Sequence, residues 1–171
     1  KKLNEYILGR SAKEIVKSTN DYWRAWVKVQ NFSFWGLGPA IIELFNKSLI
    51  YIRTHVSHNG AIIASGDSEL LKYGRDTYAY VWHRDSAFCA TALEKAGDFN
   101  ASRRFFQFCN DTLTEEGFFM HKYRPDKSLG SSWHPWVRNG EKQLPIQEDE
   151  TADVIYALWQ HYELSRDLEF V

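Results

Sequence analysis

The chain of 171 residues is long enough for one domain with its own core, and its formal net charge is −1. With that charge and no long basic run we expect no nucleic-acid partner, and no apolar stretch reaches the roughly 18 residues of a membrane span. Cys89 and Cys109 do not make a disulfide framework and favour a reduced, intracellular setting. The chain begins with Lys-Lys and shows no signal peptide, so we expect a cytoplasmic piece of a longer protein.

The N-terminal third predicts two helices. Ser11 and Glu14 have the spacing of a capping box, and apolar residues recur at helical spacing after them, which predicts a helix over residues 11–30. Residues 1–10 are expected to form a short lead-in. Pro39 suits the first turn of a second helix, which a wide apolar face extends to Val56.

A polar motif follows the long loop over residues 65–80. Trp82, Arg84 and Asp85 lie within four positions, and a helix is predicted from about residue 85 to Gly97, with Asp85 and Ser86 as N-cap types. Such a cluster suits a polar, ring-shaped ligand, because Arg and Asp bind hydroxyls and Trp stacks on an apolar ring face. The structural alternative is a capping Asp beside an inert Arg–Asp pair and a core Trp.

The same order of loop, polar motif and helix then occurs again. A helix capped by Asn100 or Ser102 runs to about Leu113, a second long loop covers 114–146, and Gln147 opens a helix over about 149–166. Both polar motifs thus stand at helix starts that follow long loops. Helical hairpins stacked around an axis would bring both motifs to one end, so the sequence predicts an all-α fold of the α/α toroid type.

Three segments of the sequence resemble the glucoamylase-type glycoside hydrolases of family 15, most closely their prokaryotic and archaeal branch. Residues 80–85, Tyr-Val-Trp-His-Arg-Asp, are similar to the family's Tyr-x-Trp-x-Arg-Asp segment. Residues 121–136 resemble a signature loop of the prokaryotic members, with Lys127 where a glycine is expected. Residues 144–151, Leu-Pro-Ile-Gln-Glu-Asp-Glu-Thr, are similar to the Pro-x-Gln-x-Asp segment at the next inner helix.

The resemblance implies an incomplete (α/α)₆ toroid, of which this chain supplies a linker helix and about four barrel helices. Residues 1–38 would be the linker-helix region and residues 39–171 part of the catalytic domain. The implied reaction is the release of glucose from the non-reducing ends of α-glucans or small α-glucosides with inversion, by a general acid and a general base. Both catalytic Glu residues are expected after Val171, so no catalytic residue is expected within this chain. Trehalase and glucodextranase of the same family are alternative activities.

The resemblance also implies the residues that bind the substrate. Arg84 and Asp85 would hold the non-reducing-end sugar, and the other expected contacts are Trp82, Gln147 and Asp149. Gln143 stands where fungal members place a Trp, so Trp133 or Trp136 is expected to stack on the sugar instead. The full expected substrate-binding set is Trp82, Arg84, Asp85, Trp133, His134, Trp136, Gln147 and Asp149.

Two further readings stay open at this stage. Asp85 could act with Asp149 or Glu150 as a catalytic pair, although a neighbouring Arg84 should lower the pKa of Asp85 and make it a poor acid. The chain could also be a non-catalytic helical module that binds carbohydrate or another protein. No cofactor and no metal are expected, since His55 and His58 lack further ligands at suitable spacing. The expected partners are an oligosaccharide or polysaccharide, and either the remainder of the barrel or a second copy of the chain.

Overall fold

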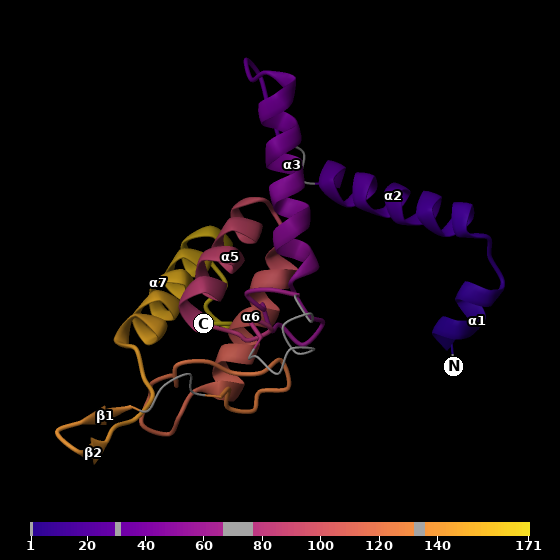
Figure 1. Ribbon diagram of the computed structural model, residues 1–171. Coiled ribbons are helices and arrows are strands. Elements are labelled where there is room, and N and C mark those ends of the chain that lie inside the picture. Colours follow the sequence, from indigo (N-terminus) through magenta and orange to yellow (C-terminus); the bar gives the residue numbers. More distant parts are fainter. Residues whose placement is uncertain (1, 30–31, 67–76, 132–135) are drawn as a thin grey trace. The chain divides into compact units, whose positions relative to one another are not determined.

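A computed structural model describes residues 2–29, 32–66, 77–131 and 136–171 (Figure 1). The chain divides into two compact units, Lys1–Ile50 and Tyr51–Val171. None of the helices in the described ranges is long and apolar enough to cross a membrane. The elements are α1 (Lys2–Leu8), α2 (Ala12–Val29), α3 (Pro39–Thr54), α5 (His83–Lys95), α6 (Phe99–Thr112), β1 (Val137–Arg138), β2 (Glu141–Lys142) and α7 (Glu148–Ser165).

The first unit begins with a helix that the sequence did not predict. Residues 1–10 were expected as a lead-in, but they contain α1. Arg10, just past the end of α1, donates a hydrogen bond of 2.9 Å from Nη1 to the hydroxyl of Tyr6 within the helix. The capping box at the start of α2 is confirmed. The Ser11 N–H donates to Glu14 Oε2 at 2.7 Å and the Glu14 N–H donates to Ser11 Oγ at 3.3 Å, which satisfies two free donors of the first turn.

The second unit is built around α5, which packs against both α6 and α7 (Figure 1). Its small buried residues Ala87 and Ala90 let the neighbouring helices approach closely. Phe105 and Phe108 of α6 are completely buried, and burying a side chain of that size stabilises a fold by roughly 1.5–3 kcal/mol. The all-α prediction is confirmed.

Helices α5 and α7 run parallel, because both ends of α5 contact α7. Arg84 meets Glu150 near the two N-termini, and the buried Glu94 hydrogen-bonds the buried His161 about ten residues further along each helix. Burial raises the pKa of the Glu94 carboxyl. Two parallel helices joined through an outer helix are the repeating arrangement of an α/α toroid.

The turn between α5 and α6 corrects one expectation. Asn100 or Ser102 was predicted to cap α6, but the cap is Asp98, whose side chain accepts from the Ala101 N–H at 3.1 Å. Ser102 is buried and donates to the Phe99 carbonyl inside the helix instead. Asp98 also pairs with Arg53 at 3.2 Å, so within the second unit the cap residue ties the last turn of α3 to this turn.

The second long loop is attached to the helix ends rather than standing free of them. Val81 and Tyr123 exchange two backbone hydrogen bonds of 2.8 and 2.9 Å. The Tyr123 hydroxyl donates to the carbonyl of Thr112 at 3.0 Å, and the His121 N–H donates to the Pro145 carbonyl at 2.6 Å. The loop also contains the β1–β2 hairpin, which was not predicted.

Candidate functional site

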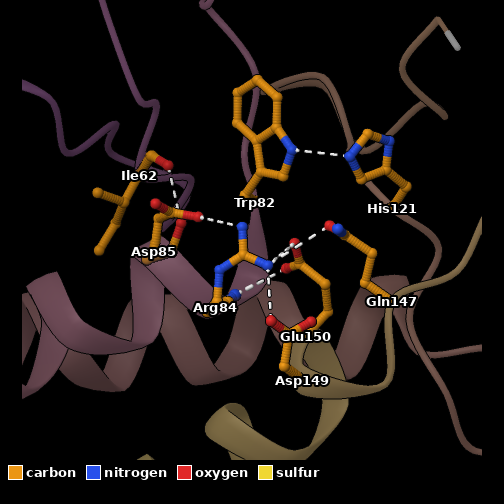
Figure 2. Close-up of polar contacts among 9 residues, drawn as sticks. Ile62, Trp82, Arg84, Asp85, His121, Gln147, Asp149 and Glu150 are labelled. Carbon is orange, nitrogen blue, oxygen red and sulfur yellow. Dashed lines mark hydrogen bonds and ion pairs between the residues drawn. The ribbon is translucent and has the colours of Figure 1, made fainter. Parts of the chain in front are cut away.

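The N-termini of α5 and α7 meet at Arg84, which lies at the centre of a polar cluster (Figure 2). Its Nη1 donates to Asp149 Oδ2 at 2.9 Å and to Gln147 Oε1 at 3.4 Å, and its Nη2 donates to Asp85 Oδ2 at 3.2 Å. Gln147 and Asp149, which lie 63 and 65 positions after Arg84 in the sequence, therefore share its guanidinium with Asp85. Of the eight predicted site residues, these are four that the structure brings together.

Glu150 is a further member of this cluster. It is completely buried, and its Oε2 accepts a hydrogen bond of 2.7 Å from the backbone N–H of Arg84. The Glu150 carboxylate thereby satisfies a free donor at the start of α5 from the neighbouring helix. This explains why α5 begins at His83 and not at Asp85: Trp82 stands at its N-cap without a side-chain hydrogen bond, and the carboxylate of Glu150 takes over that role.

Burial sets the charge state of Glu150. Removal from water raises the pKa of its carboxyl to about 7, and the nearby Asp85 and Asp149 also raise it. The Arg84 N–H and the Arg84 charge lower it, but they do not outweigh burial. From the sequence, Glu150 was considered as a possible catalytic partner of Asp85. It lies in the first turn of α7, and its side chain turns toward α5.

Trp82 forms the aromatic side of the cluster. It is buried, and its Nε1–H donates to His121 Nε2 at 3.2 Å (Figure 2). This hydrogen bond requires an unprotonated Nε2 on His121, so the imidazole is neutral when the bond is formed. Trp136 lies beyond His121, with ring centroids 5.4 Å apart, and Tyr78 lies 5.9 Å from the Trp82 ring.

An open pocket of about 270 Å³ lies between the aromatic side and the charged side. Such a volume is close to the lower limit of about 300 Å³ for small-molecule sites. Of the predicted residues, Trp82, Arg84, Asp85 and Gln147 line it, whereas Asp149 is exposed and contacts the pocket through Arg84. The full lining is Ala64, Tyr78, Trp82, Arg84, Asp85, His121 and Gln147.

Of the three remaining predicted residues, the structure describes only Trp136. Trp133 and His134 lie outside the described residues. Trp136 is half-buried and contacts His121, which lines the pocket. Ser86, predicted as an N-cap type, is buried and donates to the Ile62 carbonyl at 2.9 Å, so it fixes the segment before the loop to α5.

Four residues at the site were not in the predicted set, namely Ala64, Tyr78, His121 and Lys122. Tyr78 lies in the first long loop and Ala64 directly before it, where no periodicity marks a residue as a pocket wall. Lys122 is almost completely buried, and its Nζ lies 4.3 Å from the Tyr80 ring centroid and 5.4 Å from that of Trp82. A cation placed against ring faces is stabilised by their negative electrostatic potential. Lys122 lies in the loop that resembles the family's signature loop, but its burial between aromatic rings could not be predicted from the sequence.

Comparisons with known proteins agree with the sequence resemblance. The family model described as glycosyl hydrolases family 15 matches residues 45–169. An uncharacterized glycosyl hydrolase of Methanocaldococcus jannaschii is 29% identical over 94 residues, which are 55% of this chain and 13% of that protein. The chain thus matches only a small part of the length of this relative. No solved structure matches the chain. Since the family model covers most of the sequence, the chain belongs to glycosyl hydrolases family 15.

Proposed function

We propose that this chain forms part of the sugar-binding site of an inverting, exo-acting α-glucosidase of the glucoamylase type. The observation that carries the proposal is the arrangement around Arg84. A guanidinium, two carboxylates and an amide converge at one side of a pocket, and the buried Trp82 forms the other side. A hexose offers hydroxyls on its edges and C–H groups on its faces, which match these two kinds of wall.

Each residue has a role in this proposal. Arg84 donates to hydroxyl oxygens of the terminal sugar, and Asp85 accepts from its hydroxyl groups with the half-exposed carboxylate. Trp82 presents its ring to the sugar, with His121 fixing its orientation through the hydrogen bond to Nε1. Asp149 holds Arg84 from the outside, and Trp136, which contacts His121, would meet the next unit of a longer substrate.

The chemistry of inversion requires groups that this site does not provide. A carboxylic acid must protonate the leaving oxygen while a carboxylate on the opposite face takes a proton from the attacking water. Asp85 and Asp149 are both held by Arg84, and Glu150 is buried with its Oε2 occupied by the Arg84 N–H. We therefore propose that these residues bind substrate, and that the catalytic Glu pair belongs to sequence beyond residue 171.

The test compares binding with cleavage. The chain and the product of its complete reading frame are incubated with maltose, maltotriose, isomaltose and trehalose, and the anomer released is followed by NMR. We expect β-glucose from the complete product and none from the chain alone. Arg84→Lys in the complete product should lower kcat/KM at least tenfold, because the lysine ammonium lacks the planar guanidinium that hydrogen-bonds several partners at once. The preferred disaccharide identifies the substrate class.

A matched control for Arg84→Lys is Arg103→Lys, since Arg103 also pairs with a carboxylate, Asp167, at 2.6 Å, but does not line the pocket. The Arg103 variant should keep full activity. Cleavage by the chain alone that is lost in Asp85→Asn would show that the catalytic pair lies within these residues. Binding without cleavage by the complete product would favour the carbohydrate-binding module.

A further inference from the structure

Glu150 has contacts that neither a capping nor a packing role explains in full. Its Oε2 accepts from the backbone N–H of Arg84 at 2.7 Å, and its Oε1 lies 3.6 Å from Nη1 of the same residue. Both ends of Arg84, main chain and guanidinium, are thus held by one carboxyl group. The Oε1 atom is buried and makes no hydrogen bond within the described residues, so it faces the guanidinium mainly as a charge.

Burying a carboxyl group here is costly. An ionised carboxylate loses its hydration on burial, and an apolar side chain at the same place would avoid that cost. Capping alone does not require a charge either, since a neutral amide oxygen can also accept the Arg84 N–H. What a charged carboxyl adds is a fixed direction for the guanidinium that lies against it.

We propose that Glu150 is a positioning residue of the sugar-binding site, which fixes the Arg84 guanidinium between Asp85 and Gln147 by holding both ends of Arg84 from α7. The inference rests on the proposed function, because the guanidinium is taken as a sugar ligand. Glu150 itself does not line the pocket and does not touch the substrate. It acts by keeping Arg84 from following its exposed partner Asp149 out of the pocket.

The charge of Glu150 should then control sugar affinity. The charged and titratable groups around it are Arg84 and Asp85 on α5, Asp149 on α7 and Tyr123 on the loop. Protonation leaves an oxygen that can accept the Arg84 N–H, but it removes the charge that faces Nη1. Affinity for a neutral sugar should therefore be highest above pH 7 and fall as the pH drops below 7, because the protonated carboxyl no longer orients the guanidinium.

The test uses maltose as the probe and the whole 171-residue chain, with Glu150→Gln as the variant. Glu148→Gln is the matched control, since Glu148 is exposed in the same first turn and carries the same charge. We expect Glu150→Gln to bind maltose about tenfold more weakly at pH 8 and independently of pH, because misplacing a ligand group by a fraction of an ångström is enough for such a loss. Wild type and Glu148→Gln should show the same rise of affinity through pH 7.

A second readout does not depend on sugar. The ¹⁵N signal of the Arg84 guanidinium, assigned by its loss in Arg84→Lys, should titrate near pH 7 in wild type and in Glu148→Gln but not in Glu150→Gln. A flat Arg84 signal in wild type would overturn the inference, and this measurement needs no variant of Glu150 that folds. Equal maltose affinity in wild type and Glu150→Gln would also overturn it. Absence of maltose binding together with a titrating Arg84 would instead count against the proposed function.

Discussion

At the scale of single residues, two buried groups give the fold a pH dependence of opposite sign. Glu150 has a pKa of about 7 in the folded chain, above its ordinary value of 4.5, because of burial. The raised pKa means that the folded state favours the protonated carboxyl. The stability that this contributes is fully present below pH 4.5 and is lost as the pH rises through 7. His83 has a pKa lowered to about 3 by burial, so its contribution is present above pH 6.5 and is lost as the pH falls.

The stability profile of one variant separates these effects. Glu150→Gln removes one titration and leaves His83 unchanged, so the difference between variant and wild type isolates Glu150. As the pH rises from 4.5 to 7, we expect the free energy of unfolding of the variant to increase relative to that of wild type, by up to about 3 kcal/mol. Urea unfolding at several pH values measures this difference. A constant difference across that range would show that Glu150 titrates normally, and Glu148→Gln should show no such gain.

Lys127 allows a second prediction at this scale. It adopts φ +72°, in the left-handed region, at the turn where its N–H donates to the Arg124 carbonyl at 2.9 Å. A side chain there costs about 1 kcal/mol relative to glycine, which agrees with the glycine that the family resemblance leads one to expect. We expect Lys127→Gly to be about 1 kcal/mol more stable than Lys127→Ala in urea unfolding.

The comparison with alanine is needed because both variants lose the ion pair of Lys127 with Asp111, which is 2.7 Å long and half-exposed. Exposed pairs contribute roughly 0–1 kcal/mol, so wild type should lie between the two variants or close to Lys127→Gly. An alanine variant as stable as the glycine variant would mean that the turn relaxes out of the left-handed region.

At the scale of elements, the turn at Gly60 packs so closely against α6 that it leaves no room for a side chain. Gly60 has φ +92°, and a Cβ at this position would lie 1.9 Å from the Arg104 carbonyl oxygen. We expect Gly60→Ala to destabilise the fold by about 3 kcal/mol or more, from backbone strain and overlap together. Thermal unfolding followed by circular dichroism measures the loss.

Gly117 separates strain from overlap. It has φ +86°, but a Cβ there meets nothing within 4 Å. Gly117→Ala should therefore cost only the strain, about 1 kcal/mol. If both alanine variants lost the same stability, close packing against α6 would play no part at Gly60.

The helices with strong periodicity could be predicted from sequence. A helix end that is fixed by a residue distant in the sequence could not. The expected helices at 11–30, 39–56 and 149–166 match α2, α3 and α7 within two residues at each end. The start of α5 was misplaced because its donors are satisfied by Glu150, 66 positions away. The β1–β2 hairpin had a local signal in Asn139 and Gly140, both with positive φ, but its strands are too short to show alternation.

At the scale of the whole molecule, the pocket depends on contacts that no sequence window contains. The motifs around Arg84 and Gln147 were recognisable because each stands at a helix start, and parallel packing of α5 and α7 brings them together. His121 belongs to the loop over residues 121–136 but was not in the predicted set, since only the folded loop places it against Trp82. Residue type and helix position thus predicted the charged side of the site and Trp82, and tertiary packing decided which other aromatic rings surround Trp82.

The solution state of the chain follows from the apolar surface of α7 and α5. Large side chains that are 53–64% exposed gather there, namely Phe88, Ile155, Tyr156 and Trp159, and an open groove of about 310 Å³ lies between the two helices, with Phe88 and Tyr156 in its lining. Exposed apolar patches of this kind favour association, because joining two of them removes their surface from water. We expect the isolated chain to associate in a concentration-dependent way in sedimentation velocity.

The double variant Tyr156→Gln, Trp159→Gln should shift this equilibrium toward monomer. Its matched control is Val137→Gln, which also removes an exposed apolar side chain, 53% accessible, but from the hairpin and not from α7. The control should sediment like wild type, because a single apolar residue outside the patch adds little buried area on association. A wild-type chain that is monomeric up to high concentration and unfolds in one sharp transition would show that the α7 surface is tolerated in water, and would count against its being an interface.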